Sequence, residues 1–263
     1  MQLFKRILRF DKEAEEAPDE KRKIQRYAVG PTFPFKAVLN LLLHDGEGSV
    51  NTSDPNGQDW AGKLVNLSTS GASIQVHPAA AASRGEPCRM KFTLDAYHLE
   101  IPGTVAHFWN YRDHSLCGLA FAFPNIETQR AYLQLLQPVV IGASLTPVDP
   151  TKIKQDAPWL KKEQFVGHSV TLLTVWRHAQ GGAVHSFDFR MNRFGVRWSS
   201  GMEELDIYGL DPDAPVAKET ATAVVRLTES QQEDVRWLFC LAVPNLSKAV
   251  PPDVRKFLSQ LVA

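Results

Sequence analysis

Two short groups of residues near the start of the sequence have side chains that could bind an anion or a nucleotide. The first is Arg22 and Arg26 in KRKIQR, and the second is Asn66, Ser68 and Gly71 in LVNLSTSG. Arginine can form paired hydrogen bonds with phosphate oxygens, and it can bind or stack on a guanine base. Asn66 and Ser68 are short donors and acceptors, and a glycine lets the chain turn and a ligand approach closely. Each group could therefore form part of a ligand site.

Each group has a simpler explanation when it is taken alone. A pair of arginines in a charged segment is usually a solvated helix face, and Asn and Ser are common in turns. A tight hairpin, however, normally turns through Asn-Gly or Asp-Gly. This one carries three hydroxyl residues instead, Ser68, Thr69 and Ser70. That composition favours a turn that holds a ligand.

The segments that must position these residues have the pattern of β-strands. From Phe35 to Phe123 about six stretches alternate apolar and polar residues, and clusters of Pro, Gly, Asn and Asp separate them. No helical pattern interrupts them, so we expect an antiparallel sheet closed into a small barrel. A helix is expected in IETQRAYLQLLQ, where Tyr132, Leu133 and Leu135 with Leu136 would cover the barrel.

The two polar groups, in this order around six strands, resemble the motifs of the PilZ domain, the bacterial receptor module for cyclic di-GMP. The family's motifs are R-x-x-x-R and [DN]-x-S-x-x-G, and this sequence matches both without a substitution. The resemblance covers about residues 20–140. It implies that cyclic di-GMP binds to five residues, Arg22, Arg26, Asn66, Ser68 and Gly71. It further implies a receptor in second-messenger signalling that acts on motility, biofilm formation or polysaccharide through protein contacts.

The second half of the chain predicts another domain of the same kind. Gly71 recurs as Gly195, and FPN at Phe123–Asn125 recurs as VPN at Val243–Asn245 with nearly the same spacing, which indicates duplication. Strands are expected in SVTLLTVWRH, VHSFDFRMNRFGVRW, ATAVVRLT and VRWLFCLAV, and a helix in PPDVRKFLSQLV. The expected fold is mainly β, with two six-stranded antiparallel PilZ-like barrels in tandem, each closed by a C-terminal helix. The expected domains are an N-terminal extension (1–20), a PilZ domain (21–140), a linker (141–160) and a degenerate PilZ-like domain (161–263).

The second copy departs from both motifs. Arg190 stands where the first copy has Asn66, and Asn192 stands where it has Ser68. Lysines at 161 and 162 replace the arginine pair, and lysine lacks the planar fork of arginine. We therefore expect the second domain to have lost the nucleotide and to serve either protein contacts or the sensing of the state of the first domain.

Composition limits the classes of partner. Lys and Arg together number 29, as do Asp and Glu, so the 263-residue chain has no overall charge that would attract a nucleic acid polymer. The cysteines Cys88, Cys117 and Cys240 lie in apolar stretches, which is typical of reduced core thiols. We expect no metal and no cofactor, cyclic di-GMP being a ligand. No stretch approaches the ~18 apolar residues of a membrane span, and no signal peptide is recognisable, so a cytoplasmic location is expected.

Partners and alternative functions remain open at this stage. Leu3, Phe4 and Ile7 with Leu8 form one face of a short N-terminal helix that could dock on its own protein, a dimer mate or a membrane surface. A protein partner could bind this helix or the second barrel. An enzyme is disfavoured because no motif for a nucleophile, a phosphate loop or a metal emerges. The alternative to a receptor is a PilZ-like adaptor that binds protein and no nucleotide.

Overall fold

The computed structural model describes residues 24–42, 57–168, 170–180, 182–211 and 224–262. The chain forms two compact units, the first ending at Gln137 and the second beginning at Pro138. Arg22 and the expected N-terminal helix lie outside the described residues. The expected domain bounds stay a prediction.

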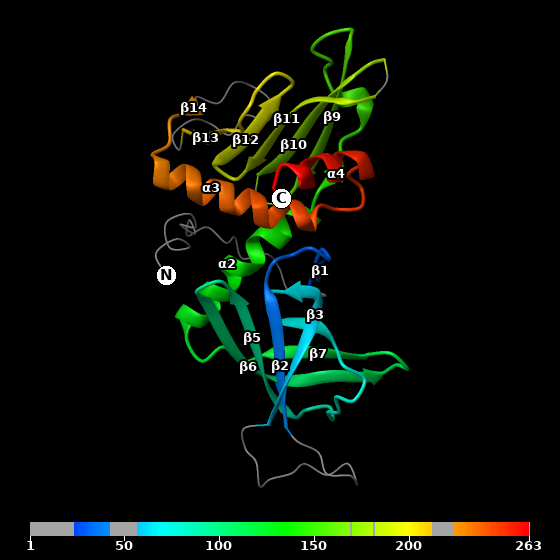
Figure 1. Ribbon diagram of the computed structural model, residues 1–263, viewed down its shortest axis with the longest axis vertical. Coiled ribbons are helices and arrows are strands. Elements are labelled where there is room, and N and C mark those ends of the chain that lie inside the picture. The colour runs from blue at the N-terminus through cyan, green and yellow to red at the C-terminus, as the bar shows by residue number, and fades with distance from the viewer. Residues whose placement is uncertain (1–23, 43–56, 169, 181, 212–223, 263) are drawn as a thin grey trace, which may run out of the picture. The chain divides into compact units, whose positions relative to one another are not determined.

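The first unit is a closed antiparallel barrel of six strands with one short additional strand (Figure 1). The barrel runs β2-β3-β4-β7-β6-β5 and back to β2, and β1 pairs with β3 outside this ring. The strands are β1 (Tyr27–Ala28), β2 (Lys36–Leu41), β3 (Gln58–Ser68), β4 (Gly71–Val76), β5 (Pro87–Leu94), β6 (Tyr97–Asn110) and β7 (Ser115–Phe121). The predicted barrel of the first domain is confirmed.

Two long, bulged strands allow this sheet to close. The first half of β3 pairs with β2 and its second half with β4, and its register shifts between Leu64 and Asn66. A second shift lies in β6 between Val105 and His107. Bulges bend a strand and increase its twist, which is how a short sheet curls round to meet its own edge.

Helix α2 (Ile126–Ala143) packs against the barrel core as predicted. Tyr132, Leu135 and Leu136 are buried, and the Tyr132 ring lies 5.0 Å from the Phe121 ring and 6.0 Å from the Phe92 ring, measured between centroids. The helix therefore rests on β5 and β7, the latter being the neighbour of β4.

The second unit has an open sheet rather than a barrel. Its strands follow each other in chain order from β8 to β14, and no pairing joins the two ends among the residues that the structure describes. They are β8 (Thr146–Pro147), β9 (Leu160–Gly167), β10 (Thr171–His178), β11 (Val184–Met191), β12 (Phe194–Ser199), β13 (Asp206–Leu210) and β14 (Val224–Val225). The mainly β fold is confirmed, but the tandem pair of barrels is not. The described strands of this sheet have eight residues or fewer, whereas β3 and β6, which carry the bends of the barrel, have 11 and 14 residues.

Helices close the core of this open sheet from one face (Figure 1). They are α3 (Glu229–Ala242) and α4 (Pro252–Gln260), joined through the 3₁₀ turn η2 (Val243–Asn245), while another 3₁₀ turn, η1 (Pro150–Lys152), follows β8. The buried Phe187 and Phe189 of β11 pack on Phe239 of α3 with ring centroids 6.0 and 6.2 Å away. In the second unit the helices thus bury the apolar face of the sheet. In the first unit the closed barrel encloses its own apolar side chains.

The strand expected in VRWLFCLAV was wrong, because these residues form the second half of α3. The buried residues Val235, Leu238, Phe239 and Ala242 repeat at helical spacing. A capping box also starts the helix: the Thr228 hydroxyl accepts a hydrogen bond from the backbone N–H of Gln231, whose side chain in turn accepts from the backbone N–H of Thr228. The helix predicted in PPDVRKFLSQLV is confirmed as α4.

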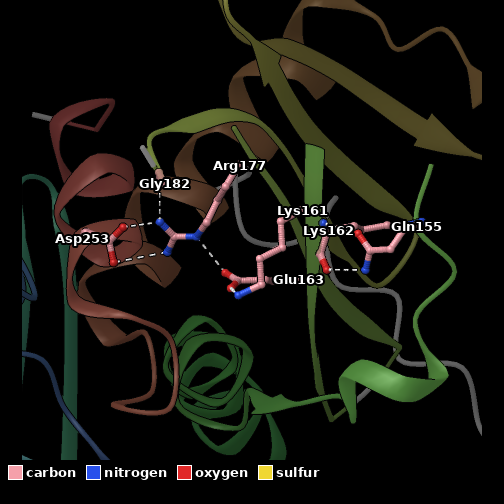
Figure 2. Close-up of polar contacts among 7 residues, drawn as sticks. All are labelled: Gln155, Lys161, Lys162, Glu163, Arg177, Gly182 and Asp253. Carbon is pink, nitrogen blue, oxygen red and sulfur yellow. Dashed lines mark hydrogen bonds and ion pairs between the residues drawn. The ribbon is translucent and has the colours of Figure 1, made fainter. Parts of the chain in front are cut away.

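A buried arginine joins the sheet of the second unit to α4 (Figure 2). The Arg177 side chain on β10 is 10% exposed, and its Nε donates to Glu163 of β9 at 2.8 Å. Its two terminal nitrogens donate to the carboxylate of Asp253, and one also donates to the carbonyl of Gly182 at 2.9 Å. The hydrogen bond from Arg177 is the main reason why the pKa of Asp253 lies below its usual range.

Replacing Arg177 by Ala should lower the free energy of unfolding of the second unit by about 2–3 kcal/mol, because the partly buried Glu163 would keep only the exposed Lys161 as its partner. Asp253 is half-exposed and would be rehydrated, which keeps the loss below that of a fully buried pair. Urea unfolding would measure the change. Arg197→Ala is the matched control, since Arg197 is half-exposed in its ion pair with Asp206 and should cost at most about 1 kcal/mol. Equal losses of stability in both variants would contradict the role of Arg177 in joining the sheet to α4.

Candidate functional site

The turn of the β3–β4 hairpin is held in one shape by its own hydroxyl and by α2. Ser68 pairs with Gly71 across a turn formed by Thr69 and Ser70, and the Ser68 hydroxyl donates to the Gly71 carbonyl at 3.2 Å. The buried Tyr132 hydroxyl donates to the carbonyls of Ser68 at 2.7 Å and Gly71 at 3.1 Å. The polar turn is therefore fixed in place by the helix that covers the barrel.

Gly71 is needed for a close approach between strands. A Cβ atom at this position would lie 2.2 Å from the carbonyl oxygen of Leu119 on β7, which no side chain could tolerate without a shift of the backbone. Its φ is not positive, so the expected role in turning the chain is not what requires glycine here. The glycine of the motif instead lets β4 and β7 close together at the hairpin end of the barrel.

Arg26 is brought to this hairpin by β1. Tyr27 pairs with Leu67 and Ala28 pairs with Asn66, so the residue before Tyr27 lies beside Ser68 at the end of β3. The backbone N–H of Val29 continues the pairing by donating to the carbonyl of Val65 at 3.0 Å. Antiparallel pairing with the motif strand thus places one arginine of the first motif at the second motif. Arg22 lies outside the described residues.

These residues line one open pocket of about 690 Å³. That volume falls within the range of about 300–1,000 Å³ typical of small-molecule sites. Its described lining contains the cation Arg26 and the titratable His107 but no carboxylate, which favours an anionic ligand. The lining residues are Ile24, Arg26, Asn66, Ser68, Ser70, Gly71, Ala72, Ala106, His107, Gly118, Leu119 and Ala120.

His107 is a pocket residue that the sequence motifs did not indicate. It pairs with Gly118 across β6 and β7, and its ring occupies the space beside that glycine, 2.1 Å from where a Cβ would stand. The Trp109 ring lies 4.2 Å away on the other side. Burial, with the positive charges of Arg26 and Arg84, lowers the pKa of His107 below its ordinary value of 6.5. The alternation of β6 places His107 and Trp109 on one face, but only the folded barrel shows that this face reaches the pocket.

Gly195, which the sequence comparison aligns with Gly71, has a side chain packed against it in the second unit. The ring of Tyr208 on β13 lies against Gly195, 2.1 Å from where a Cβ would stand, and its hydroxyl donates to Asp188. Arg190 is engaged as well, since its Nε donates to Asp188 at 3.1 Å. In the second unit Tyr208 and Arg190 are therefore used for internal contacts with Asp188.

No metal site and no membrane span are found in the part of the chain that the structure describes. Within these ranges, no three His, Cys, Asp or Glu side chains come close enough together to hold an ion. No described helix is both long and apolar enough to cross a bilayer. Cys88 and Cys117 are free and buried, as predicted, and burial raises the pKa of each thiol to about 12, while Cys240 is free and half-buried.

Comparison with known proteins agrees with the motifs. Residues 20–137 match the model of the PilZ domain family, a stretch somewhat shorter than half of the chain. The first part of this protein is therefore a PilZ domain, and the expected family is confirmed. No curated protein matches the chain.

Solved structures similar to part of the chain include two described as PilZ domains and one described as a c-di-GMP complex. The PilZ domain with c-di-GMP of YcgR from Escherichia coli is 11% identical, with a TM-score of 0.32, and the match covers 44% of this chain and 88% of that one. The K. pneumonia MrkH–c-di-GMP complex is 13% identical, with a TM-score of 0.33 and coverage of 45% and 51%. The PilZ domain of CeSA from a cellulose-synthesizing bacterium is 16% identical, with a TM-score of 0.28 and coverage of 42% and 93%. With identities and TM-scores this low, we base the function on the family match and on the pocket of this chain.

Proposed function

We propose that the PilZ domain of this protein is a receptor for cyclic di-GMP and that binding changes the protein's contacts with a partner. The observation that carries the proposal is the pocket that gathers Arg26 with Asn66, Ser68 and Gly71. All four belong to the two motifs that pointed to this ligand, and they meet although about forty residues of sequence separate the groups.

The chemistry of the pocket suits a cyclic dinucleotide. Cyclic di-GMP carries two phosphate charges and two guanines, so it needs cations that can also recognise a base. Arg26 supplies one such group beside the hairpin, and Arg22, four residues earlier in the sequence, is proposed as the second. The Asn66 amide and the Ser68 hydroxyl are proposed to contact a guanine edge or a phosphate oxygen.

The second unit is proposed to serve protein contacts rather than to bind the nucleotide. Tyr208 occupies the space beside Gly195, and Arg190 is paired with Asp188, which supports this division of roles. We propose that the domain is not catalytic and that its output reaches motility, biofilm or polysaccharide regulation through a protein partner. The competing function is an adaptor that binds its partner without nucleotide.

Calorimetric titration of the full chain with cyclic di-GMP tests the proposal. We expect saturable binding to wild type, and much weaker binding of cyclic di-AMP, because its adenines lack the O6 acceptor that arginine reads on guanine. GTP serves as a control for binding of any guanine nucleotide. If none of the three ligands binds, the receptor function is wrong and the adaptor is favoured. Equal affinity for all three would contradict specific recognition.

A further inference from the structure

The pocket has a third polar wall besides the hairpin and the arginine segment. It consists of His107 on β6. Arg84, in the loop before β5, does not line the pocket itself but lies close enough for its charge to act on His107. Hydrogen bonds fasten that loop alongside β6: the backbone N–H of Gly85 donates to the Val105 carbonyl at 2.7 Å, and the Val105 N–H donates to the Glu86 carbonyl at 2.9 Å. Arg84 is therefore attached close to the strand residues that lead to His107.

His107 is held in position by its neighbours rather than by a polar partner. Gly118 on β7 has no side chain, which leaves room for the His107 imidazole from β6. The Trp109 ring packs against the imidazole with an interplanar angle of 30°. No hydrogen bond between the imidazole and another described residue is found. The ring nitrogens are thus available to a molecule in the pocket.

Positive charge accumulates around His107. The charged groups that act on it are Arg26, from the segment before β1, and Arg84, from the loop before β5. Neither arginine forms an ion pair with another residue in the described part of the chain. Two cations without a carboxylate partner, whose charges both act on the imidazole, favour an anion beside it.

We propose that His107 and Arg84 form, together with Arg26, a subsite for a phosphate of the ligand, and that His107 takes up a proton when the ligand binds. This inference rests on the proposed function, because the phosphate is that of cyclic di-GMP. In the free protein burial, followed by the charges of Arg26 and Arg84, holds the pKa of the His107 imidazole below its ordinary value of 6.5. A phosphate in the subsite supplies the opposite charge, favours the imidazolium and gains a donated hydrogen bond from it.

The sign of the pH dependence follows from this change. Binding raises the pKa of His107 from below 6.5 to a higher value, so the complex holds more protons than the free protein between the two values. Affinity must then increase as the pH falls through this interval and level off below the pKa of the free protein. An opposite charge at contact distance shifts a pKa by about one unit or more, which corresponds to roughly tenfold in affinity. The phosphodiester and guanine groups of the ligand do not titrate between pH 5.5 and 8.

The test is calorimetric titration of the full-length protein with cyclic di-GMP between pH 5.5 and 8, and in two buffers of different ionisation enthalpy near pH 7. We expect wild type to bind about tenfold more tightly at pH 5.5 than at pH 8 and to take up protons near pH 7. His107→Gln should flatten the pH profile and abolish proton uptake. His98→Gln, on the same strand but outside the pocket, should retain both. Arg84→Ala should weaken binding by about tenfold, while Arg112→Ala, whose charge is not among those that act on His107, should leave it unchanged.

The outcomes separate this inference from the receptor function. Tight binding that does not change with pH and takes up no proton would overturn the subsite while leaving the receptor intact. Absence of binding by wild type at every pH would overturn both. Because proton uptake is measured on wild type, a folding defect in His107→Gln would not decide the question.

Discussion

The double variant Arg22→Ala/Arg26→Ala should bind cyclic di-GMP at least about 100-fold more weakly than wild type. Each single variant should lose about 1.5–3 kcal/mol of charge-assisted hydrogen bonding, or roughly 10- to 150-fold in Kd. Arg26 is placed at the pocket by the pairing of β1 with β3, so its replacement removes a cation that the fold holds beside the hairpin. Titration calorimetry or fluorescence of a labelled ligand would measure the change.

Lysine at the same positions provides a sharper comparison. Lys keeps the charge but cannot make the planar pair of hydrogen bonds, so Arg26→Lys should restore only part of the affinity. Arg89→Ala is a suitable control, because Arg89 pairs at 3.2 Å with Glu100 on the barrel surface and does not line the pocket. Wild-type binding by the double variant would show that the site has been placed wrongly.

Tyr132→Ala should produce the largest loss of stability in the first unit, about 3–5 kcal/mol. The side chain is completely buried among Phe92, Phe121 and Phe123, and its removal leaves a cavity between α2 and the barrel. Two backbone carbonyls of the hairpin, those of Ser68 and Gly71, also lose their shared donor. Thermal and urea unfolding, observed through tyrosine and tryptophan fluorescence, would measure the loss.

Tyr132→Phe separates packing from hydrogen bonding. It keeps the ring, so we expect a loss of only about 1–2 kcal/mol, together with weaker nucleotide binding because the Ser68–Gly71 turn is no longer fixed. Tyr111→Ala is the control, as Tyr111 is half-exposed and stacks only on His114. If Tyr132→Phe changed stability but left affinity untouched, the link between α2 and the binding turn would be absent.

The barrel was predictable because its signals are local. Alternating residues such as Leu119 and Phe121 define strands, and the motif residues Asn66, Ser68 and Gly71 stand where a strand must end. The meeting of Arg26 with this turn was indicated only by the family motifs. In the structure it follows from one short strand pairing, Tyr27 with Leu67.

The remaining features depend on contacts between distant segments. His107 and Tyr132 looked like ordinary strand and helix residues, and their roles appear only when β6 meets β7 and α2 meets the hairpin. The helical residues Val235 to Ala242 were predicted as a strand because a dense apolar run satisfies both patterns. The capping box from Thr228 to Gln231 was the local signal that could have decided between them. Whether a sheet closes depends on strand length and bulges, which alternation alone does not report.

Hydrogen exchange of the full chain with and without cyclic di-GMP tests the two-sided site most directly. The account predicts that protection rises together in the segment carrying Arg22 and Arg26 and in the turn from Asn66 to Gly71. It predicts a smaller rise at His107 and no direct effect at the Asn192–Gly195 hairpin. Protection confined to one side of the pocket, or centred on the second sheet, would contradict it.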